Sequence, residues 1–274
     1  MATGKQDDSS PSLTVWQPPT GGAGKPFSLD KCPPDAKPFS RGNKARDKLA
    51  VDALALELDS LQDLFYADRR FKLLVLLQGT DTAGKDGAVR GVFSRTSPLG
   101  VHTVGWKAPT EVERDHDYLW RIHQKMPGAG ETMVFNRSHY EDVLVPVVNG
   151  WITPAQTAQR YAHINDFERL LAETGTVILK FMLHIGSDEQ RQRLQERVDD
   201  PTKHWKFSGG DLDVHLRHQR AGGVEDAEAA LVGLVAHRLR HAVRAEHQRG
   251  AGRHVGQVFD EDRALGLEVV HHVG

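Results

Sequence analysis

A glycine-rich segment that directly follows a short apolar run constrains this 274-residue chain more than any other feature. The run, residues 72–77, reads KLLVLL, which is typical of a strand buried on both faces of a sheet. After it, Gly79, Gly84 and Lys85 satisfy the pattern G-x-x-x-x-G-K in the strand-to-helix context that this motif requires. Backbone N–H groups in such a P-loop turn inward around a phosphate, and the helix N-terminus adds partial positive charge. The segment therefore predicts a phosphate-binding loop in which Lys85 supplies a mobile cation.

Two acidic residues of this loop depart from the general pattern. Asp86 stands where Ser or Thr normally binds Mg²⁺, and Asp81 lies inside the loop. Because a carboxylate among phosphates is unfavourable unless a cation lies between them, we expect Asp81 or Asp86 to contact Mg²⁺ or to orient the acceptor. The alternative is that Asp81 only caps the turn by accepting hydrogen bonds from backbone N–H groups.

Apolar strands and amphipathic helices alternate from residue 72 onward, after a helix of about 25 residues that starts near Lys44. This order predicts an α/β fold with parallel strands and helices on both faces of the sheet. The predicted strands are residues 72–77, 101–106, 132–135 and 177–184, and the predicted helices after the first are residues 84–95, 111–125, 153–173 and 188–198.

A second group of polar side chains follows the third predicted strand. In open parallel sheets, ligands bind beyond the carboxyl ends of the strands, so Asn136 and Arg137 are expected close to the phosphate loop. Arg137 can stabilise charge on a transferred group, and Glu141 and Asp142 can hold a metal through water. We interpret His139 as a capping or packing residue.

A basic run between residues 190 and 206 follows the fourth predicted strand. Each cation alone fits a solvated helix face, but together they predict a cationic wall beside the loop that suits a polyanionic substrate. Trp205, within the run, can either stack on a base or anchor an interface. The basic residues are Arg191, Arg193, Arg197, Lys203, His204 and Lys206.

The composition narrows the class of protein. A single cysteine, Cys32, excludes a disulfide framework and a thiolate metal cluster, and it fits a reducing compartment. Lys and Arg number 35 against 37 Asp and Glu, so no overall basic charge indicates a nucleic-acid partner. The apolar runs are too short to span a membrane and the N-terminus lacks a secretory signal. We therefore expect a cytoplasmic protein with no nucleic-acid or membrane partner.

The two ends of the chain differ from its middle. Residues 1–43 hold seven of the 13 prolines and no apolar periodicity, which predicts an extended or disordered arm. Residues 209–274 contain no Ser, Thr, Lys, Ile, Pro, Met, Asn, Tyr, Trp or Cys. We interpret residues 214–274 as an atypical tail that reads like a frameshifted GC-rich gene, with a natural His- and Arg-rich helical extension as the alternative. On the first interpretation, one edge of the sheet is left uncovered.

The loop and four further blocks, spread over residues 40–213, resemble the second family of polyphosphate kinases. The blocks are ERDHDYLWRIH at 113–123, FNRSHYEDV at 135–143, YAHINDFE at 161–168 and DPTKHWK at 200–206. The resemblance implies a P-loop kinase-like, three-layer α/β/α fold with a mostly parallel sheet and a helical lid, over residues 44–213. It also implies Mg²⁺-dependent phosphoryl transfer between inorganic polyphosphate and nucleotides (AMP, ADP and ATP) in a homo-oligomer. The Glu141–Asp142 pair is similar to that of members acting on AMP and ADP.

The resemblance also assigns roles to individual residues. It implies catalytic roles for Asp81, Lys85, Asn136 and Arg137, nucleotide or phosphate binding by Gly79, Gly84, Gly87, Arg193, Lys203 and Lys206, lid roles for Arg160 and Arg169, and Mg²⁺ binding by Asp81, Glu141 and Asp142. Two alternatives stay open at this point: an ATP-dependent nucleoside monophosphate kinase, and an inactive relative that binds nucleotide or polyphosphate without turnover.

Overall fold

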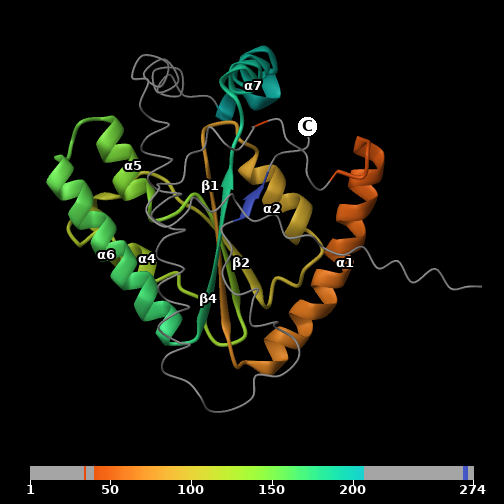
Figure 1. The fold of residues 1–274 in the computed structure, drawn as a ribbon, viewed down its shortest axis with the longest axis horizontal. Helices are drawn as coiled ribbons and strands as arrows, with labels where there is room; N and C mark the ends of the chain where they lie inside the picture. Colours follow the sequence, from red (N-terminus) through yellow and green to blue (C-terminus); the bar gives the residue numbers. More distant parts are fainter. Residues whose placement is uncertain (1–33, 35–39, 207–267, 271–274) are drawn as a thin grey trace, which may run out of the picture.

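A parallel β-sheet forms the centre of the computed structural model, which describes Pro34, residues 40–206 and residues 268–270 (Figure 1). The strand order is β2-β3-β1-β4-β5, and the four pairings are all parallel. The predicted parallel sheet is therefore confirmed. Its strands are β1 (Lys72–Gly79), β2 (Val101–Gly105), β3 (Thr132–Asn136), β4 (Thr176–Leu183) and the short β5 (Glu268–Val270).

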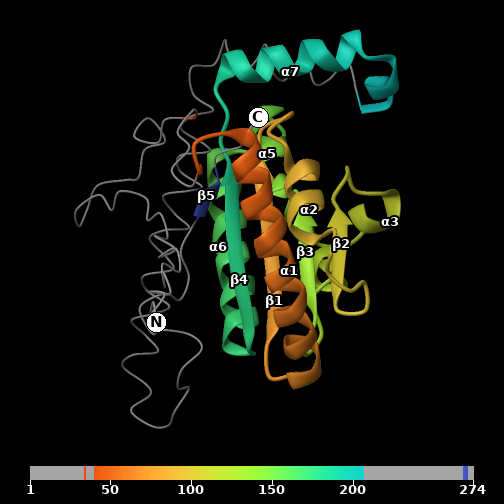
Figure 2. The same cartoon turned by 90° about the vertical axis from the view of Figure 1, so that its right-hand side faces the viewer.

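Helices cover both faces of this sheet, which gives three layers (Figure 1). One face carries α2, with α1 packed outside it, and the other carries α4, α5 and α6. A further helix, α7, crosses beyond the carboxyl ends of the strands (Figure 2). In the described part of the chain, no helix has the length and apolar character to cross a bilayer. The helices are α1 (Lys44–Asp68), α2 (Lys85–Phe93), α3 (Glu111–Arg114), α4 (Trp120–His123), α5 (Glu141–Val148), α6 (Pro154–Glu173), α7 (Ser187–Asp199) and the 3₁₀ helix η2 (Pro201–Lys206).

The alternation of side chains along β1 divides the core into two parts. Leu74 and Leu76 point into the larger cluster, where they meet the apolar faces of α5 and α6. Val75 and Leu77 point to the opposite face and pack with residues of α2. Both faces of β1 are thus buried, which is why its sequence is apolar throughout rather than alternating.

Local capping explains where the two long helices begin. Asn43 accepts a hydrogen bond from the backbone N–H of Arg46 at the start of α1. At the start of α6, Thr153 and Gln156 form a reciprocal capping box, and Pro154 occupies the first helical position. Both helices were predicted at these positions, and the structure confirms them.

Two predictions about elements are wrong. The expected single helix over residues 111–125 is instead two short helices, α3 and α4, because Asp117 accepts a hydrogen bond from the Leu119 N–H and turns the chain between them. The edge of β4 is also not left uncovered along its whole length, because β5 pairs with Phe181–Leu183. The rest of the proposed tail, and the arm over residues 1–43 apart from Pro34 and residues 40–43, lie outside the described residues.

A buried cluster of charged and polar groups joins α6 to the sheet. The Glu168 carboxylate on α6 pairs with the Lys180 ammonium on β4, and it accepts a hydrogen bond from the Tyr140 hydroxyl at 3.0 Å. His139 Nε2 lies 3.0 Å from the same carboxylate and is fully buried, as its interpretation as a packing residue requires. Burial alone raises the pKa of Glu168, but Lys180 and His139 outweigh it and lower that pKa to about 2.

We predict that Glu168→Gln lowers the free energy of unfolding by about 3–5 kcal/mol at pH 7, because it leaves the Lys180 charge buried without its partner. The loss depends on pH, since the folded-state pKa lies below its ordinary value of 4.5. The contribution of Glu168 is fully present above pH 4.5 and disappears as the pH falls toward 2. Urea unfolding at pH 7 and pH 3.5 measures both effects, with Glu173→Gln, an exposed carboxyl on the same helix, as the control. Equal losses at the two pH values would contradict this.

Candidate active site

The loop between β1 and α2 has the geometry of a phosphate-binding turn. Gly84 caps α2 with φ +96°, a left-handed conformation that glycine adopts without strain. At the other end, a Cβ added to Gly79 would lie 2.6 Å from the Leu183 carbonyl oxygen of β4, so only glycine fits there. Lys85 is buried, and its Nζ donates to the carbonyl oxygens of Gly79 at 2.6 Å and Thr80 at 2.9 Å. The Lys85 ammonium is therefore held by carbonyl oxygens of the same loop.

Arg137 links this loop to the residues that follow β3. One guanidinium nitrogen lies 3.0 Å from Asp81 Oδ1 and the other lies 3.4 Å from Glu141 Oε2. Gln78, the penultimate residue of β1, donates to the other Glu141 oxygen at 2.7 Å and accepts a hydrogen bond from the Ser138 hydroxyl at 3.0 Å. Two carboxylates and one guanidinium thus meet at the carboxyl edge of the sheet, as predicted for Asp81, Arg137 and Glu141.

The backbone holds Arg137 in an unusual conformation. Its φ is +67°, which L residues rarely adopt, and its N–H donates to the Leu77 carbonyl oxygen of β1 at 3.0 Å. The preceding residue, Asn136, donates from its amide to Asp86 Oδ1 at 2.7 Å. The turn after β3 is therefore bound to both ends of the phosphate loop, a juncture where backbone strain is commonly retained for function.

Asp142 lies apart from this group, although it is the neighbour of Glu141. Its buried carboxylate pairs with Arg121 of α4 at 3.0 Å, and its carbonyl oxygen accepts from Arg160 of α6. Burial raises the pKa of Asp142, and Arg121 lowers it only in part. Successive residues of a helix point about 100° apart, so Glu141 and Asp142 serve different partners. The structure does not bring Asp142 to Asp81.

The two expected lid arginines both lie on α6, but the helix above the loop is α7 (Figure 2). Arg160 is engaged at the base of α5 and over the Tyr118 ring, 4.9 Å from its centroid. Arg169 is paired at the surface with Asp166, near the amino end of β4 and far from the loop. The element that covers the loop is α7, not α6.

Two residues of α7 contact the phosphate loop directly. Arg193, expected to bind phosphate, donates to the Thr82 carbonyl oxygen at 3.0 Å and pairs with Glu189. Gln190 donates to the Asp81 carbonyl oxygen at 3.2 Å. Sequence reasoning missed Gln190 and Gln78, since a neutral amide carries no charge pattern, and only their positions at the loop-side ends of α7 and β1 could have marked them.

The remaining predicted residues lie at the margin of this group. Gly87 is exposed in the first turn of α2. Lys203 pairs with Asp200 at 3.1 Å in the segment that follows α7. The side chains of Trp205 and Lys206 lie outside the described part of the structure.

Comparison with known proteins decides the family. The family model described as polyphosphate kinase 2 matches residues 41–228. The chain belongs to the polyphosphate kinase 2 family. It is 50% identical, over 187 residues, to an AMP/ADP-polyphosphate phosphotransferase of Meiothermus ruber, a match that covers 68% of this chain and 70% of that protein.

Two further matches agree with this family assignment. An ADP-polyphosphate phosphotransferase of Rhodopseudomonas palustris is 37% identical over 204 residues, which cover 70% of each chain. The crystal structure of polyphosphate kinase 2 from Arthrobacter aurescens TC1 superposes with a TM-score of 0.69 at 43% identity, over 77% of each chain. The P-loop kinase-like fold expected from the resemblance is therefore confirmed.

Phosphotransferases of this kind require a divalent metal, and this polyphosphate kinase 2 member has carboxylates beside the phosphate loop that suit a divalent cation. The described residues hold no group of three or more acidic, His or Cys side chains arranged as a metal site. A hard divalent cation at a phosphate needs only one or two protein carboxylates, because phosphate and water oxygens complete its shell. Asp81 and Glu141, on either side of Arg137, supply that number.

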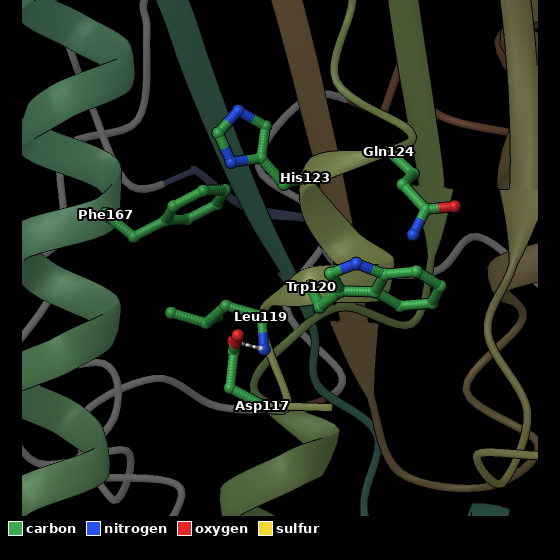
Figure 3. A pocket seen from close by; sticks show the side chains of 6 residues that line it. All are labelled: Asp117, Leu119, Trp120, His123, Gln124 and Phe167. Atoms are coloured by element: carbon green, nitrogen blue, oxygen red, sulfur yellow. Dashed lines mark hydrogen bonds between the residues drawn. The ribbon is translucent and has the colours of Figure 1, made fainter. Parts of the chain in front are cut away.

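A separate cavity of about 390 Å³ lies between α4 and α6 (Figure 3). None of the predicted site residues lines it. Its walls are mostly aromatic and amide side chains, with the His123 and Phe167 rings 5.6 Å apart. The lining residues are Asp117, Leu119, Trp120, His123, Gln124 and Phe167.

We predict that Gly79→Ala lowers the free energy of unfolding by about 1–3 kcal/mol, because the new Cβ would meet the Leu183 carbonyl at 2.6 Å. Gly91→Ala is the matched control: a Cβ there meets nothing within 4 Å, and alanine raises helix propensity by up to about 1 kcal/mol. Chemical unfolding of both variants should show opposite signs. A stabilised Gly79→Ala would contradict the close approach of β1 and β4.

Proposed function

We propose that this chain transfers a phosphoryl group between inorganic polyphosphate and AMP or ADP, with Mg²⁺ as the metal, in the cytoplasm. The observation that carries the proposal is the convergence of Lys85, Arg137 and Asp81 on one phosphate loop. The chain is 50% identical to a protein named AMP/ADP-polyphosphate phosphotransferase, and this identity supports the choice of donor and acceptor.

Charge neutralisation by Lys85 is the first contribution to this mechanism. Its ammonium is held by the Gly79 and Thr80 carbonyls, and an arriving phosphate oxygen takes over one or both of these hydrogen bonds. Because the group is buried, its electrostatic effect on the phosphate is larger than in water. The helix N-terminus of α2 adds backbone N–H donors at the same place.

Orientation by Arg137 is the second contribution. A guanidinium forms two parallel hydrogen bonds to phosphate oxygens, and the bonds to Asp81 and Glu141 fix its plane. Asn136 holds Asp86 at the start of α2, so the loop and the turn after β3 keep one relative position. Phosphoryl transfer needs positioning and charge stabilisation rather than a covalent protein intermediate, and this arrangement supplies both.

Asp81 and Glu141 are the residues that would hold Mg²⁺. The metal, when bound, neutralises negative charge on the phosphate oxygens. Asp142 does not take part, since Arg121 holds its carboxylate. Above the loop, α7 brings Arg193 and other cations to the side from which a polyanion would enter.

Lys85→Ala should reduce kcat for ATP and ADP formation from polyphosphate and AMP by at least about 10²-fold, because a preorganised charge donor is lost. Lys125→Ala is the control, since that lysine is exposed and lies beyond α4. Near-normal turnover in Lys85→Ala would overturn the assignment. ATP in place of polyphosphate, with the same AMP, separates the proposal from an ATP-dependent nucleoside monophosphate kinase, which would use ATP as the donor.

Asp81→Asn should raise the Mg²⁺ concentration for half-maximal rate by about tenfold or more, because a direct carboxylate ligand is lost. Asp142→Asn should leave that concentration within about twofold and lower the melting temperature instead, because the buried Arg121 loses the closer of its two carboxylate partners and keeps only Glu113, at 3.8 Å. Rates over a Mg²⁺ titration and thermal unfolding measure the two effects. If Asp142→Asn raised the Mg²⁺ concentration for half-maximal rate as much as Asp81→Asn does, the metal site would include Asp142.

A further inference from the structure

The apolar row of β1 that faces α5 and α6 ends in a polar residue, Gln78. Successive side chains of a strand alternate between its two faces, so Gln78 lies on the same face as Leu74 and Leu76. It is 9% exposed, and both ends of its amide are paired. Its Nε2 donates to Glu141 Oε1 at 2.7 Å, and its Oε1 accepts from the Ser138 hydroxyl at 3.0 Å. The central strand therefore supplies a hydrogen-bond donor to the first residue of α5.

The hydrogen bonds around Ser138 fix the direction in which this amide faces. The backbone N–H of Tyr140 can only donate, and it donates to Ser138 Oγ at 3.3 Å. The hydrogen of the Ser138 hydroxyl then goes to Gln78 Oε1, which leaves Nε2 of the same amide for Glu141. The reverse orientation of the amide would bring its oxygen against an oxygen of Glu141, and an ionised carboxylate has no hydrogen to donate. Glu141 is thus held by a donor whose orientation derives from the backbone.

Gln78 is the firmer of the two side chains that hold Glu141. The Arg137 guanidinium lies 3.4 Å from Glu141 Oε2, and the Arg137 side chain is 40% exposed. The Gln78 bond is shorter, comes from a buried residue and has an ionised acceptor, which makes it about twice as strong as a bond between neutral groups. In the proposed function Arg137 also binds phosphate, so Gln78 is the contact that keeps Glu141 in place throughout.

The two contacts leave room on Glu141 for a cation. A carboxylate offers about four lone-pair sites, and Gln78 and Arg137 each use one, on different oxygens. We propose that Gln78 is a positioning residue for metal binding, which holds the Glu141 carboxylate ready to bind a divalent cation together with Asp81. This inference rests on the proposed function, in which Asp81 and Glu141 hold Mg²⁺.

Binding of Mn²⁺ to the full-length chain tests this role without turnover. Mn²⁺ takes the same oxygen ligands as Mg²⁺, and the electron paramagnetic resonance signal of the free ion measures how much is bound. Gln78→Met keeps a side chain of similar size but removes both hydrogen bonds. It should raise the dissociation constant for Mn²⁺ by about tenfold or more, as the loss of a residue that orients a metal ligand does.

Gln62→Met is the matched control. Gln62 is 5% exposed on α1, and within the described residues its amide has no hydrogen-bond partner. The substitution therefore changes a buried glutamine in the same way, without touching Glu141. It should leave the dissociation constant for Mn²⁺ within about twofold of the wild-type value. A loss equal to that of Gln78→Met would overturn the proposal, because any disturbance of the core would then have the same effect.

Ser138→Ala tests the orientation of the amide without changing Gln78 itself. The amide loses the partner that sets its direction, so the dissociation constant for Mn²⁺ should rise about twofold to tenfold, the equivalent of one hydrogen bond. The double variant Gln78→Met/Ser138→Ala should bind no more weakly than Gln78→Met, because Ser138 acts only through Gln78. Two losses that multiply would overturn the proposal. If Gln78→Met does not fold, Ser138→Ala carries the test alone.

Glu141→Gln separates this inference from the proposed function. It should raise the dissociation constant for Mn²⁺ at least as much as Gln78→Met does. An unchanged constant would overturn both the metal role of Glu141 and the positioning role of Gln78. A constant raised by Glu141→Gln but not by Gln78→Met would overturn the positioning role alone. In the rate assay with polyphosphate and AMP, saturating Mg²⁺ should restore most of the rate of Gln78→Met but not that of Glu141→Gln, since only the first keeps the carboxylate.

Discussion

The common edge at which β1, β3 and β4 end is the constraint on which the site depends. Parallel register places Leu77 beside Asn136 and Gly79 beside Leu183, so the residues after each strand emerge at one place. The N–H of Arg137 donates to the Leu77 carbonyl oxygen, which continues the sheet by one more hydrogen bond beyond β3. With a different register, the same residues would be present, but the phosphate loop and Arg137 would not lie at one site.

Burial separates the charges that hold the fold from those that serve chemistry. Glu168 and Lys180 are enclosed between α6 and the sheet, and Arg121 and Asp142 are enclosed beside α4 and α5. The Asp81–Arg137–Glu141 group is partly open to solvent, with the Arg137 side chain the most exposed of the three, so a phosphate can reach it. Glu141 and Asp142 are adjacent in sequence yet fall into different groups, because a helix turns their side chains in different directions.

The sequence predicted the sheet, the two long helices and the phosphate loop, since apolar periodicity and glycine spacing report directly on local conformation. It also placed Asn136 and Arg137 beside the loop, because parallel strands share their carboxyl edge. The sequence analysis assigned Glu141 and Asp142 to the same metal site, whereas the structure gives them different partners. It also placed the lid arginines on α6, whereas α7 is the helix that lies over the phosphate loop. Both depend on how helices pack against the sheet, which local pattern does not determine. Gln78 and Gln190 were missed because an uncharged amide looks the same in a solvated position and in a site.

The short connection from β4 to α7 couples two parts of the molecule. The Leu183 carbonyl oxygen lies where a side chain at position 79 would otherwise stand, next to Gly79. The helix α7 begins four residues after Leu183, at Ser187. It contacts the phosphate loop through Gln190 and Arg193. The position of α7 and the shape of the loop are therefore in thermodynamic linkage. Anything that tightens α7 on the loop must raise the affinity of the loop for phosphate by the same factor by which phosphate tightens α7.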